Sequence, residues 1–328
     1  MSHALIADLG GTNARFALVP IHQFQPQEVQ VLACKHYENF FDAAAFYIES
    51  CSVDMTQIDA VVLAIAGPVN QAVIRFSNNP WHFTQAEVQA YFGENMPIGL
   101  LNDFDAIGHC LEILAPEECV EIGSAKSVDA SAPAWVIGAG TGLGVACVVP
   151  QAGANLILPG EGGHVDVTSC NEQEDYILHF LRARHQRVSA ERVLSGMGLE
   201  NIYEALSHRE GVIKRITAEE IGAALADNDP IALATLEQFF VYLGRVVGDL
   251  ILSVEARGGI YIAGGIVPRY LAQIQRSGFR DAMKAKGRMG NLVAAIPTFV
   301  MTAQYPGLMG CANYASYLVK TSKTVVKA

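Results

Sequence analysis

Three short polar clusters contain the side chains of this chain that could do chemistry. They are Asn102 with Asp103, Glu161 with His164, and Glu191. Carboxylate and amide groups bind neighbouring hydroxyls of a polyol through paired hydrogen bonds. A carboxylate can also accept the proton of a reacting hydroxyl. The clusters therefore predict a site for a sugar.

Each cluster also has a purely structural explanation. Asp103 could cap the helix expected after it, while Asp105, on that helix, is expected in solvent. Glu191 could belong to an exposed ion pair at a helix start. Glu161 and His164 have the i, i+3 spacing of a di-iron ligand pair, but the glycines around them prevent a stable helix, and the sequence holds no second pair of this kind. Metal binding by Glu161 and His164 is therefore not expected.

Two glycine turns, at residues 8–13 and 138–144, each lie between two apolar segments. Glycine tolerates positive φ and adds no side chain, so such a turn can direct several backbone N–H groups at one anion. A third glycine pair follows an apolar run at residues 260–263. The residues concerned are Ala7, Asp8, Leu9, Gly10, Gly11, Thr12 and Asn13 in the first turn, Gly138, Gly140, Thr141 and Gly142 in the second, and Gly264 and Gly265 in the third. The repeated turn predicts a site for a polyphosphate.

Several familiar nucleotide motifs are absent from these turns. A Walker A loop needs a Lys after its glycines, and neither of the first two turns has one. A dinucleotide fingerprint opens a helix, whereas residues 145–149 have the pattern of a strand. Residues 102–105 do not form the D-F-G motif of protein kinases, and no matching catalytic loop accompanies them.

The composition is that of a globular protein large enough for two domains. The 328 residues are 51% hydrophobic and 17% charged, and the formal net charge of −11 argues against a nucleic-acid or anionic-membrane partner. Seven scattered cysteines without a C-x-x-C pair indicate reduced thiols and a cytoplasmic protein, and no targeting peptide is visible. The uncharged stretch 130–160 contains prolines and many glycines, which favours buried sheet over a membrane span.

Hydrophobic periodicity and turn chemistry predict an α/β protein. Strands are expected at 4–7, 16–19, 28–33, 60–66, 98–101, 135–137, 145–149 and 260–263, turns at 67–68 and 78–81, and helices at 41–51, from Asp103 onward, from Asp229-Pro230 to Gly258-Gly259, and at 307–320. Trp81 is expected in the core. Apart from the two similar glycine turns, the sequence contains no visible internal repeat.

The glycine segments resemble the ATPase superfamily of actin, chaperones and hexokinase. More specifically, the sequences D-x-G-G-T-N-A-R, N-D-F, G-A-G-T-G-L-G, L-P-G-E-G-G-H-V-D and V-S-A-E-R-V-L-S-G resemble bacterial glucokinases of the non-ROK, hexokinase-like type. This resemblance covers nearly the whole chain. It implies two ribonuclease H-like domains with mixed sheets flanked by helices, and ATP and sugar in the interdomain cleft. The implied domains are 1–113 with 307–328, and 114–306.

The resemblance also implies roles for individual residues. The glucose ligands would be Asn102, Asp103, Glu161, His164 and Glu191, with Asp103 as the catalytic base, and the glycine segments would hold ATP. Asp8 would bind Mg²⁺ through water, and the protein would be a cytoplasmic homodimer. Two alternatives stay open at this point: a kinase for another hexose or an amino sugar, and an ATP-switched binding protein of the actin or chaperone type.

Overall fold

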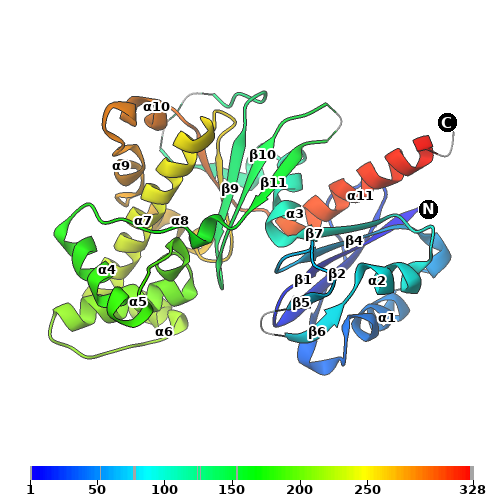
Figure 1. Ribbon diagram of the computed structural model, residues 1–328, viewed down its shortest axis with the longest axis horizontal. Helices are drawn as coiled ribbons and strands as arrows, with labels where there is room; N and C mark the ends of the chain where they lie inside the picture. The colour runs from blue at the N-terminus through cyan, green and yellow to red at the C-terminus, as the bar shows by residue number, and fades with distance from the viewer. Residues whose placement is uncertain are drawn as a thin grey trace. The chain divides into compact units, whose positions relative to one another are not determined.

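The computed structural model describes residues 2–51, 53–76, 79–123, 125, 127–152 and 154–325 (Figure 1). The chain forms two compact units. Unit 1 comprises Met1–Ala115, Gln151–Pro159 and Ala303–Ala328, and unit 2 comprises Pro116–Pro150 and Gly160–Thr302. The unit boundaries lie close to the expected domain boundaries, but residues 151–159, which we expected in the larger domain, group with unit 1.

Unit 1 is built around a five-stranded sheet with the order β3-β2-β1-β4-β7. Strand β1 pairs antiparallel with β2 and parallel with β4, and β4 pairs parallel with β7. The strands of the unit are β1 (His3–Leu9), β2 (Asn13–Pro20), β3 (Gln30–Ala33), β4 (Ile58–Ile65), β7 (Ile98–Asn102) and a separate hairpin of β5 (Ile74–Phe76) and β6 (Asn79–Phe83). Its helices are η1 (Cys34–His36), α1 (Phe40–Ser50), η2 (Met55–Gln57), α2 (Gln85–Phe92), α3 (Asp103–Cys110) and α11 (Pro306–Val325).

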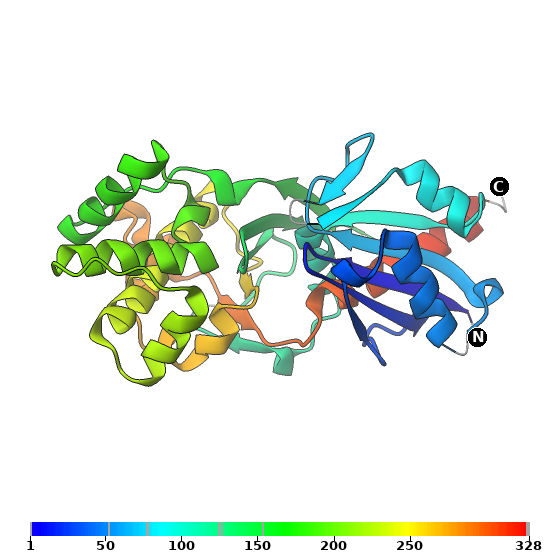
Figure 2. The ribbon, with the colours of Figure 1, turned by 90° about the horizontal axis from the view of Figure 1, so that it is seen from below.

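Both faces of this sheet are covered, which explains the continuous apolar runs of its strands. Successive residues of β1 point to opposite faces: Leu5 belongs to the cluster that contains α1 and α2, and Ile6 to the cluster that contains α3 and α11. The two helix layers lie on opposite sides of the sheet (Figure 2). Trp81 is buried at 2% exposure in the first of these clusters, as expected.

Two local expectations in unit 1 were wrong. Asn79 lies at the start of strand β6 rather than in a turn, and Asn78 lies outside the described residues. The cap of α3 is Asn102, whose side chain accepts a hydrogen bond from the N–H of Phe104, so Asp103 is the first helical residue. An Asn or Asp side chain at a helix start can accept the N–H of the residue two positions later in the sequence. Of the neighbours Asn102 and Asp103, the first takes this capping position.

The second sheet has the order β11-β10-β9-β12-β13-β8. Its strands in unit 2 are β8 (Cys119–Glu121), β9 (Ala134–Ala139), β10 (Leu143–Val149), β12 (Ile260–Ala263) and β13 (Thr298–Met301), whereas β11 (Leu156–Gly160) groups with unit 1 except for Gly160. The helices are η3 (Pro116–Glu118), η4 (Gly162–His164), α4 (Glu172–His185), η5 (Ala190–Arg192), α5 (Gly196–Arg209), α6 (Ala218–Ala226), α7 (Pro230–Val254), η6 (Val267–Tyr270), α8 (Leu271–Ile274), α9 (Phe279–Lys284), η7 (Gly287–Met289) and α10 (Gly290–Ala294).

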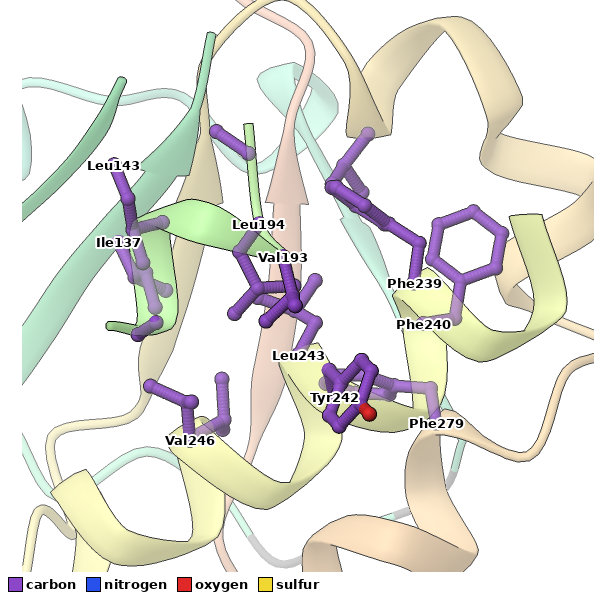
Figure 3. Packing of buried hydrophobic residues seen from close by; sticks show 14 of the residues in the cluster. Ile137, Leu143, Val193, Leu194, Phe239, Phe240, Tyr242, Leu243, Val246 and Phe279 are labelled. Carbon is purple, nitrogen blue, oxygen red and sulfur yellow. The ribbon is translucent and has the colours of Figure 1, made fainter. Parts of the chain in front are cut away.

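Helix α7 is the centre of the core of unit 2, where Phe239 and Leu243 pack with residues from the sheet and from the segment before α5 (Figure 3). It begins at Asp229-Pro230 as predicted, but it ends at Val254, because Glu255 adopts a left-handed conformation. Among the described residues α7 is the one helix long and apolar enough to cross a membrane, and 67% of that apolar window is buried inside the protein. A core helix passes the same test, and the packing of α7 explains its composition.

Candidate active site

In unit 1, the first glycine turn and the Asn102-Asp103 pair lie along one edge of the sheet. The parallel register pairs Leu9 with Ile65 and Ile65 with Asn102, so the carboxyl ends of β1, β4 and β7 are level. This edge is where open α/β sheets bind ligands. The structure therefore brings together two predicted groups that are about 90 residues apart in the sequence.

The backbone of the first glycine turn is held by hydrogen bonds on its inner side. The N–H of Gly10 donates to the carbonyl oxygen of Asn13 (3.0 Å), and the N–H of Cys34 donates to that of Thr12 (2.9 Å). The Cys34 thiol lies 3.7 Å from the carbonyl oxygen of Gly10. These hydrogen bonds fix the backbone of the turn, and neither Gly10 nor Gly11 has a positive φ.

Asp8 lies at the end of β1, beside this turn. Its Oδ2 accepts a hydrogen bond from Arg15 at 3.0 Å, and its side chain is 28% exposed. Burial raises the pKa of Asp8, and the Arg15 guanidinium counteracts part of that rise. Mg²⁺ at a phosphate-binding site is typically held by one or two carboxylates, by waters and by the phosphates themselves. The position and partial exposure of Asp8 fit such an ion bound through water, although no cluster of three metal-ligating side chains occurs among the described residues.

Asn102 and Asp103 are fixed at the junction of β7 and α3. The Asn102 side chain donates to the carbonyl oxygen of Gly67 at 3.2 Å, and both side chains accept from the N–H of Phe104 (2.9 and 3.0 Å). Burial, and secondly the negative charge of Asp8, raise the pKa of Asp103 to about 6. A carboxylate with a pKa near neutrality is a better proton acceptor than an ordinary aspartate.

We expected Asp105 to lie in solvent, and this expectation was wrong. It is half-buried, its Oδ1 has no hydrogen-bond partner within the described part of the chain, and burial raises its pKa to about 6. The sequence places Asp105 on α3, but only the tertiary packing shows which side of the helix is covered.

In unit 2, the second glycine turn connects β9 and β10, which pair as a regular antiparallel hairpin. The N–H of Gly140 donates to the carbonyl oxygen of Gly142 (2.9 Å), and the carbonyl oxygen of Gly140 accepts from the N–H of Gly196 (2.8 Å). Glu191 Oε2 accepts from the N–H of Leu143 at 3.0 Å. Glu191 is therefore not part of an exposed ion pair at a helix start, because its carboxylate faces this turn.

Glu161 and His164 lie in the 3₁₀ turn that follows β11. Their side chains are 77% and 54% exposed, and Glu161 Oε2 is 3.8 Å from His164 Nε2. Arg187 donates to the carbonyl oxygen of His164 at 2.7 Å and to Asp166 at 2.8 Å. This tethers the Glu161–His164 segment to the chain just before Glu191, so the structure brings the three predicted sugar-binding side chains of unit 2 onto neighbouring segments.

The two segments are also joined through their backbones. The N–H of Val167 donates to the carbonyl oxygen of Val188 (3.1 Å), and the N–H of Ala190 donates to that of Val165 (2.8 Å). These two bonds flank an isolated antiparallel bridge.

A cavity of about 610 Å³ in unit 2 lies beside the second glycine turn. Gly140 and Thr141 form part of its wall, and another part of the wall follows the third glycine pair in the sequence. Sequence reasoning did not identify the other wall residues, which include Gly196, Met197, Glu200, Ala218, Ile266, Arg269 and Tyr270. They come from three segments, so no local pattern marks them.

Gly264 fixes the start of the third glycine segment. Its φ is +85°, and a Cβ there would be 2.4 Å from the carbonyl oxygen of Ala139. Only glycine permits this conformation and this close approach to β9. The segment is thereby held against the strand that leads into the second glycine turn.

A second cavity, of about 480 Å³, lies in unit 1 between the end of α3 and α11, with His109 and Tyr314 in its wall. None of the residues predicted for the sugar or the polyphosphate lines it. We therefore do not assign the predicted site to this cavity.

Comparison with known proteins identifies relatives along almost the whole chain. The glucokinase family model matches residues 5–318. The glucokinase of Pseudomonas aeruginosa PAO1 is 40% identical over 309 residues, which cover 93% of this chain and 92% of the relative. That of Chromohalobacter salexigens is 39% identical and covers 94% and 95%.

Solved structures agree with these matches. The crystal structure of a glucokinase from an Antarctic psychrotroph has a TM-score of 0.85 at 30% identity, covering 96% of this chain and 99% of the other. A ROK family glucokinase from Streptomyces griseus, solved in complex with glucose and AMPPNP, shares the fold, with a TM-score of 0.61 at 18% identity and coverage of 96% and 99%.

The fold and the paired glycine turns define a sugar kinase of the actin-like ATPase fold. The chain belongs to the glucokinase family. It is an enzyme that phosphorylates glucose with ATP, which confirms the function expected from the resemblance.

Proposed function

We propose that the enzyme transfers the γ-phosphoryl group of ATP to the 6-hydroxyl of D-glucose, with Asp103 as the general base. The observation that carries this proposal is the position of Asp103, a carboxyl group with a pKa raised to about 6 at the sheet edge that also holds the first glycine turn. Asp103 accepts the hydroxyl proton as the oxygen attacks phosphorus, and the P–O bond to ADP breaks.

The other predicted side chains bind and orient glucose. In unit 1, the Asn102 amide is held by Gly67 and can hydrogen-bond a sugar hydroxyl beside Asp103. In unit 2, Glu161, His164 and Glu191 lie on joined segments and can bind further hydroxyls. A ring held at several hydroxyls presents one of them to the reacting phosphoryl group, which is the main contribution of binding to such a reaction.

Backbone N–H groups dominate the proposed ATP site. Ala7 to Asn13 in unit 1, and Gly138, Gly140, Thr141 and Gly142 in unit 2, bind the phosphates. The 610 Å³ cavity beside Gly264 and Gly265 has room for the adenosine. Asp8 would hold Mg²⁺ through water, and the ion would neutralise charge on the phosphates.

The regiochemistry and the substrate range are tested together. ADP release is measured with glucose, mannose, fructose and N-acetylglucosamine, and the glucose product is examined by ³¹P and ¹³C NMR. We expect ADP release to depend on glucose and the product to be glucose 6-phosphate. Phosphate on another hydroxyl would refute the proposed role of Asp103 toward the 6-hydroxyl, and faster turnover of another hexose would refute the proposed glucose preference.

We also propose a cytoplasmic location and a homodimeric state. All seven cysteines lie in the described part of the chain and none of them forms a disulfide there, as in proteins of a reducing compartment. Sedimentation at low protein concentration tests the dimer, and a monomer there would contradict it.

A further inference from the structure

The second glycine turn is held by a side chain that we propose as a sugar ligand. Glu191 Oε2 accepts the N–H of Leu143, the residue that follows the turn, at 3.0 Å. The fit between them is tight, because a Cβ at Gly142 would lie 2.6 Å from the same oxygen. Glycine at 142 therefore makes room for the Glu191 carboxylate, and not only for an anion.

The segment that contains Glu191 is joined to the turn at a second point. The N–H of Gly196 donates to the carbonyl oxygen of Gly140 at 2.8 Å. Between the two contacts, the Ser195 hydroxyl donates to the carbonyl oxygen of Glu191 at 2.8 Å and accepts from the N–H of Gly198 at 3.0 Å. The turn and the segment 190–196 are thus connected by a short, closed set of hydrogen bonds.

Close packing gives this connection little freedom. Val193 and Leu194 are fully buried in the core that also contains Ile137 and Leu143 from the two strands of the hairpin (Figure 3). Well-packed cores transmit displacements instead of absorbing them. A shift of the Glu191 side chain should therefore displace the residues of the turn.

The other carboxylate oxygen is available for a ligand. Glu191 Oε1 has no hydrogen bond to any residue that the structure describes. A negative charge beside a turn that binds phosphates opposes phosphate binding unless donors take up that charge. A sugar hydroxyl that donates to Oε1 supplies such a donor and keeps Oε2 on the N–H of Leu143.

We propose that Glu191 couples the two substrate sites within unit 2, so that glucose on Oε1 orders the second glycine turn and tightens ATP binding. This inference rests on the proposed sugar and phosphate roles of these residues. Coupling of this kind is reciprocal. ATP must therefore tighten glucose binding by the same factor.

The test is a thermodynamic cycle measured by calorimetry on the full-length enzyme. The affinity for AMPPNP with Mg²⁺ is determined with and without saturating glucose, and the affinity for glucose with and without AMPPNP. For the wild type we expect a coupling factor of at least about fivefold, the lower end of typical allosteric couplings. A factor of one in the wild type would overturn the proposal.

Two variants locate the coupling. Gly142→Ala removes no functional group but displaces the Glu191 carboxylate, and Glu191→Asp keeps the charge but shortens its reach. In each we expect the factor to fall to about one to two, well below that of the wild type. Gly307→Ala is the control glycine substitution, because its Cβ meets no atom within 4 Å and Gly307 belongs to neither proposed substrate site. It is expected to keep the wild-type factor, whatever its effect on affinity itself.

The outcomes separate this inference from the proposed function. Wild-type coupling in folded Gly142→Ala and Glu191→Asp would overturn the coupling role, even if glucose binding is weakened in Glu191→Asp. Unchanged glucose affinity of Glu191→Ala without nucleotide would instead refute Glu191 as a sugar ligand. If Gly142→Ala fails to fold, Glu191→Asp decides alone. A general loss of structure would weaken the binding of AMPPNP and of glucose, but it would not change the factor by which each ligand tightens the other.

Discussion

Two carboxyl groups lie in the first turn of α3, and their surroundings give them different chemistry. Asp103 accepts the N–H of Phe104 and lies close enough to Asp8 for that charge to raise its pKa. Asp105 is half-buried with an unpartnered Oδ1, and burial alone is the largest cause of its raised pKa. Only Asp103 belongs to the sheet edge that carries the first glycine turn.

Replacing Asp103 tests its role as the base. We expect Asp103→Asn to lower kcat by roughly 10²- to 10⁴-fold, the usual contribution of a general base. The amide oxygen of Asn can still accept the N–H of Phe104. Because a general base acts on the proton that moves during the reaction, glucose affinity measured by calorimetry should change by no more than about threefold. A kcat close to that of the wild type would remove Asp103 from this role.

The pH dependence tests which carboxyl group is responsible. Since Asp103 must be ionised to accept a proton, kcat/KM for glucose should rise with pH through an apparent pKa of about 6. Asp105 also has a pKa of about 6, so Asp105→Asn is the discriminating variant. It should keep the acid limb, moved slightly to lower pH, because the negative charge of Asp105 contributes to the raised pKa of Asp103. Disappearance of the limb in Asp105→Asn would assign it to Asp105 instead.

The raised pKa of Asp105 also affects the stability of the protein. The folded state binds a proton on Asp105 more tightly than the unfolded state, whose pKa is near 3.8. The free energy of unfolding should therefore fall as the pH rises from 3.8 to about 6. Urea unfolding at several pH values should show a smaller fall in Asp105→Asn than in the wild type, and an equal fall would show that Asp105 is not perturbed.

At the scale of elements, α11 positions α3 and thus the residue proposed as the base. The two helices touch so closely that a Cβ at Gly310 would be 1.7 Å from the carbonyl oxygen of Ala106. Cys311 and Ala312 on α11 also belong to the core cluster that contains Ala106. The contact is between backbones, which leaves no room for a side chain to adjust.

Gly310→Ala should therefore destabilise the protein by about 1–3 kcal/mol, the usual cost of overpacking, or by more. Gly307→Ala is the control on the same helix, because its Cβ meets no atom within 4 Å. The control should be neutral or stabilising by up to about 1 kcal/mol through helix propensity. Equal midpoints of the two variants in urea unfolding would contradict the proposed close contact.

The elements themselves were largely predictable, because their signals are local. Continuous apolar runs gave the central strands, and Asp229-Pro230 marked the start of α7. The glycines at 142 and 310 show what local signals miss: each makes room for a group, Glu191 or Ala106, that comes from a distant part of the chain. The wall of the cavity proposed for adenosine was missed for the same reason, because Met197 and Tyr270 meet only in the folded protein.

At the scale of the whole molecule, the chain passes between the two units at four points, after Ala115, Pro150, Pro159 and Thr302. Unit 1 and unit 2 nevertheless have separate hydrophobic cores. Asn102, one of the proposed glucose ligands, belongs to unit 1. Glucose should therefore stabilise unit 1, and the effect should be measurable there.

The two tryptophans make that measurement possible, because Trp81 is buried in unit 1 and Trp135 belongs to unit 2. In a Trp135→Phe background, Trp81 fluorescence reports the unfolding of unit 1. A ligand at 100 times its Kd stabilises the folded state by about 2.7 kcal/mol, which is similar to the expected penalty of Gly310→Ala. Saturating glucose should thus return the Trp81 midpoint of Gly310→Ala close to that of the unliganded parent. Adding Asn102→Ala should reduce this recovery, and full recovery in that variant would show that Asn102 does not contribute to glucose binding.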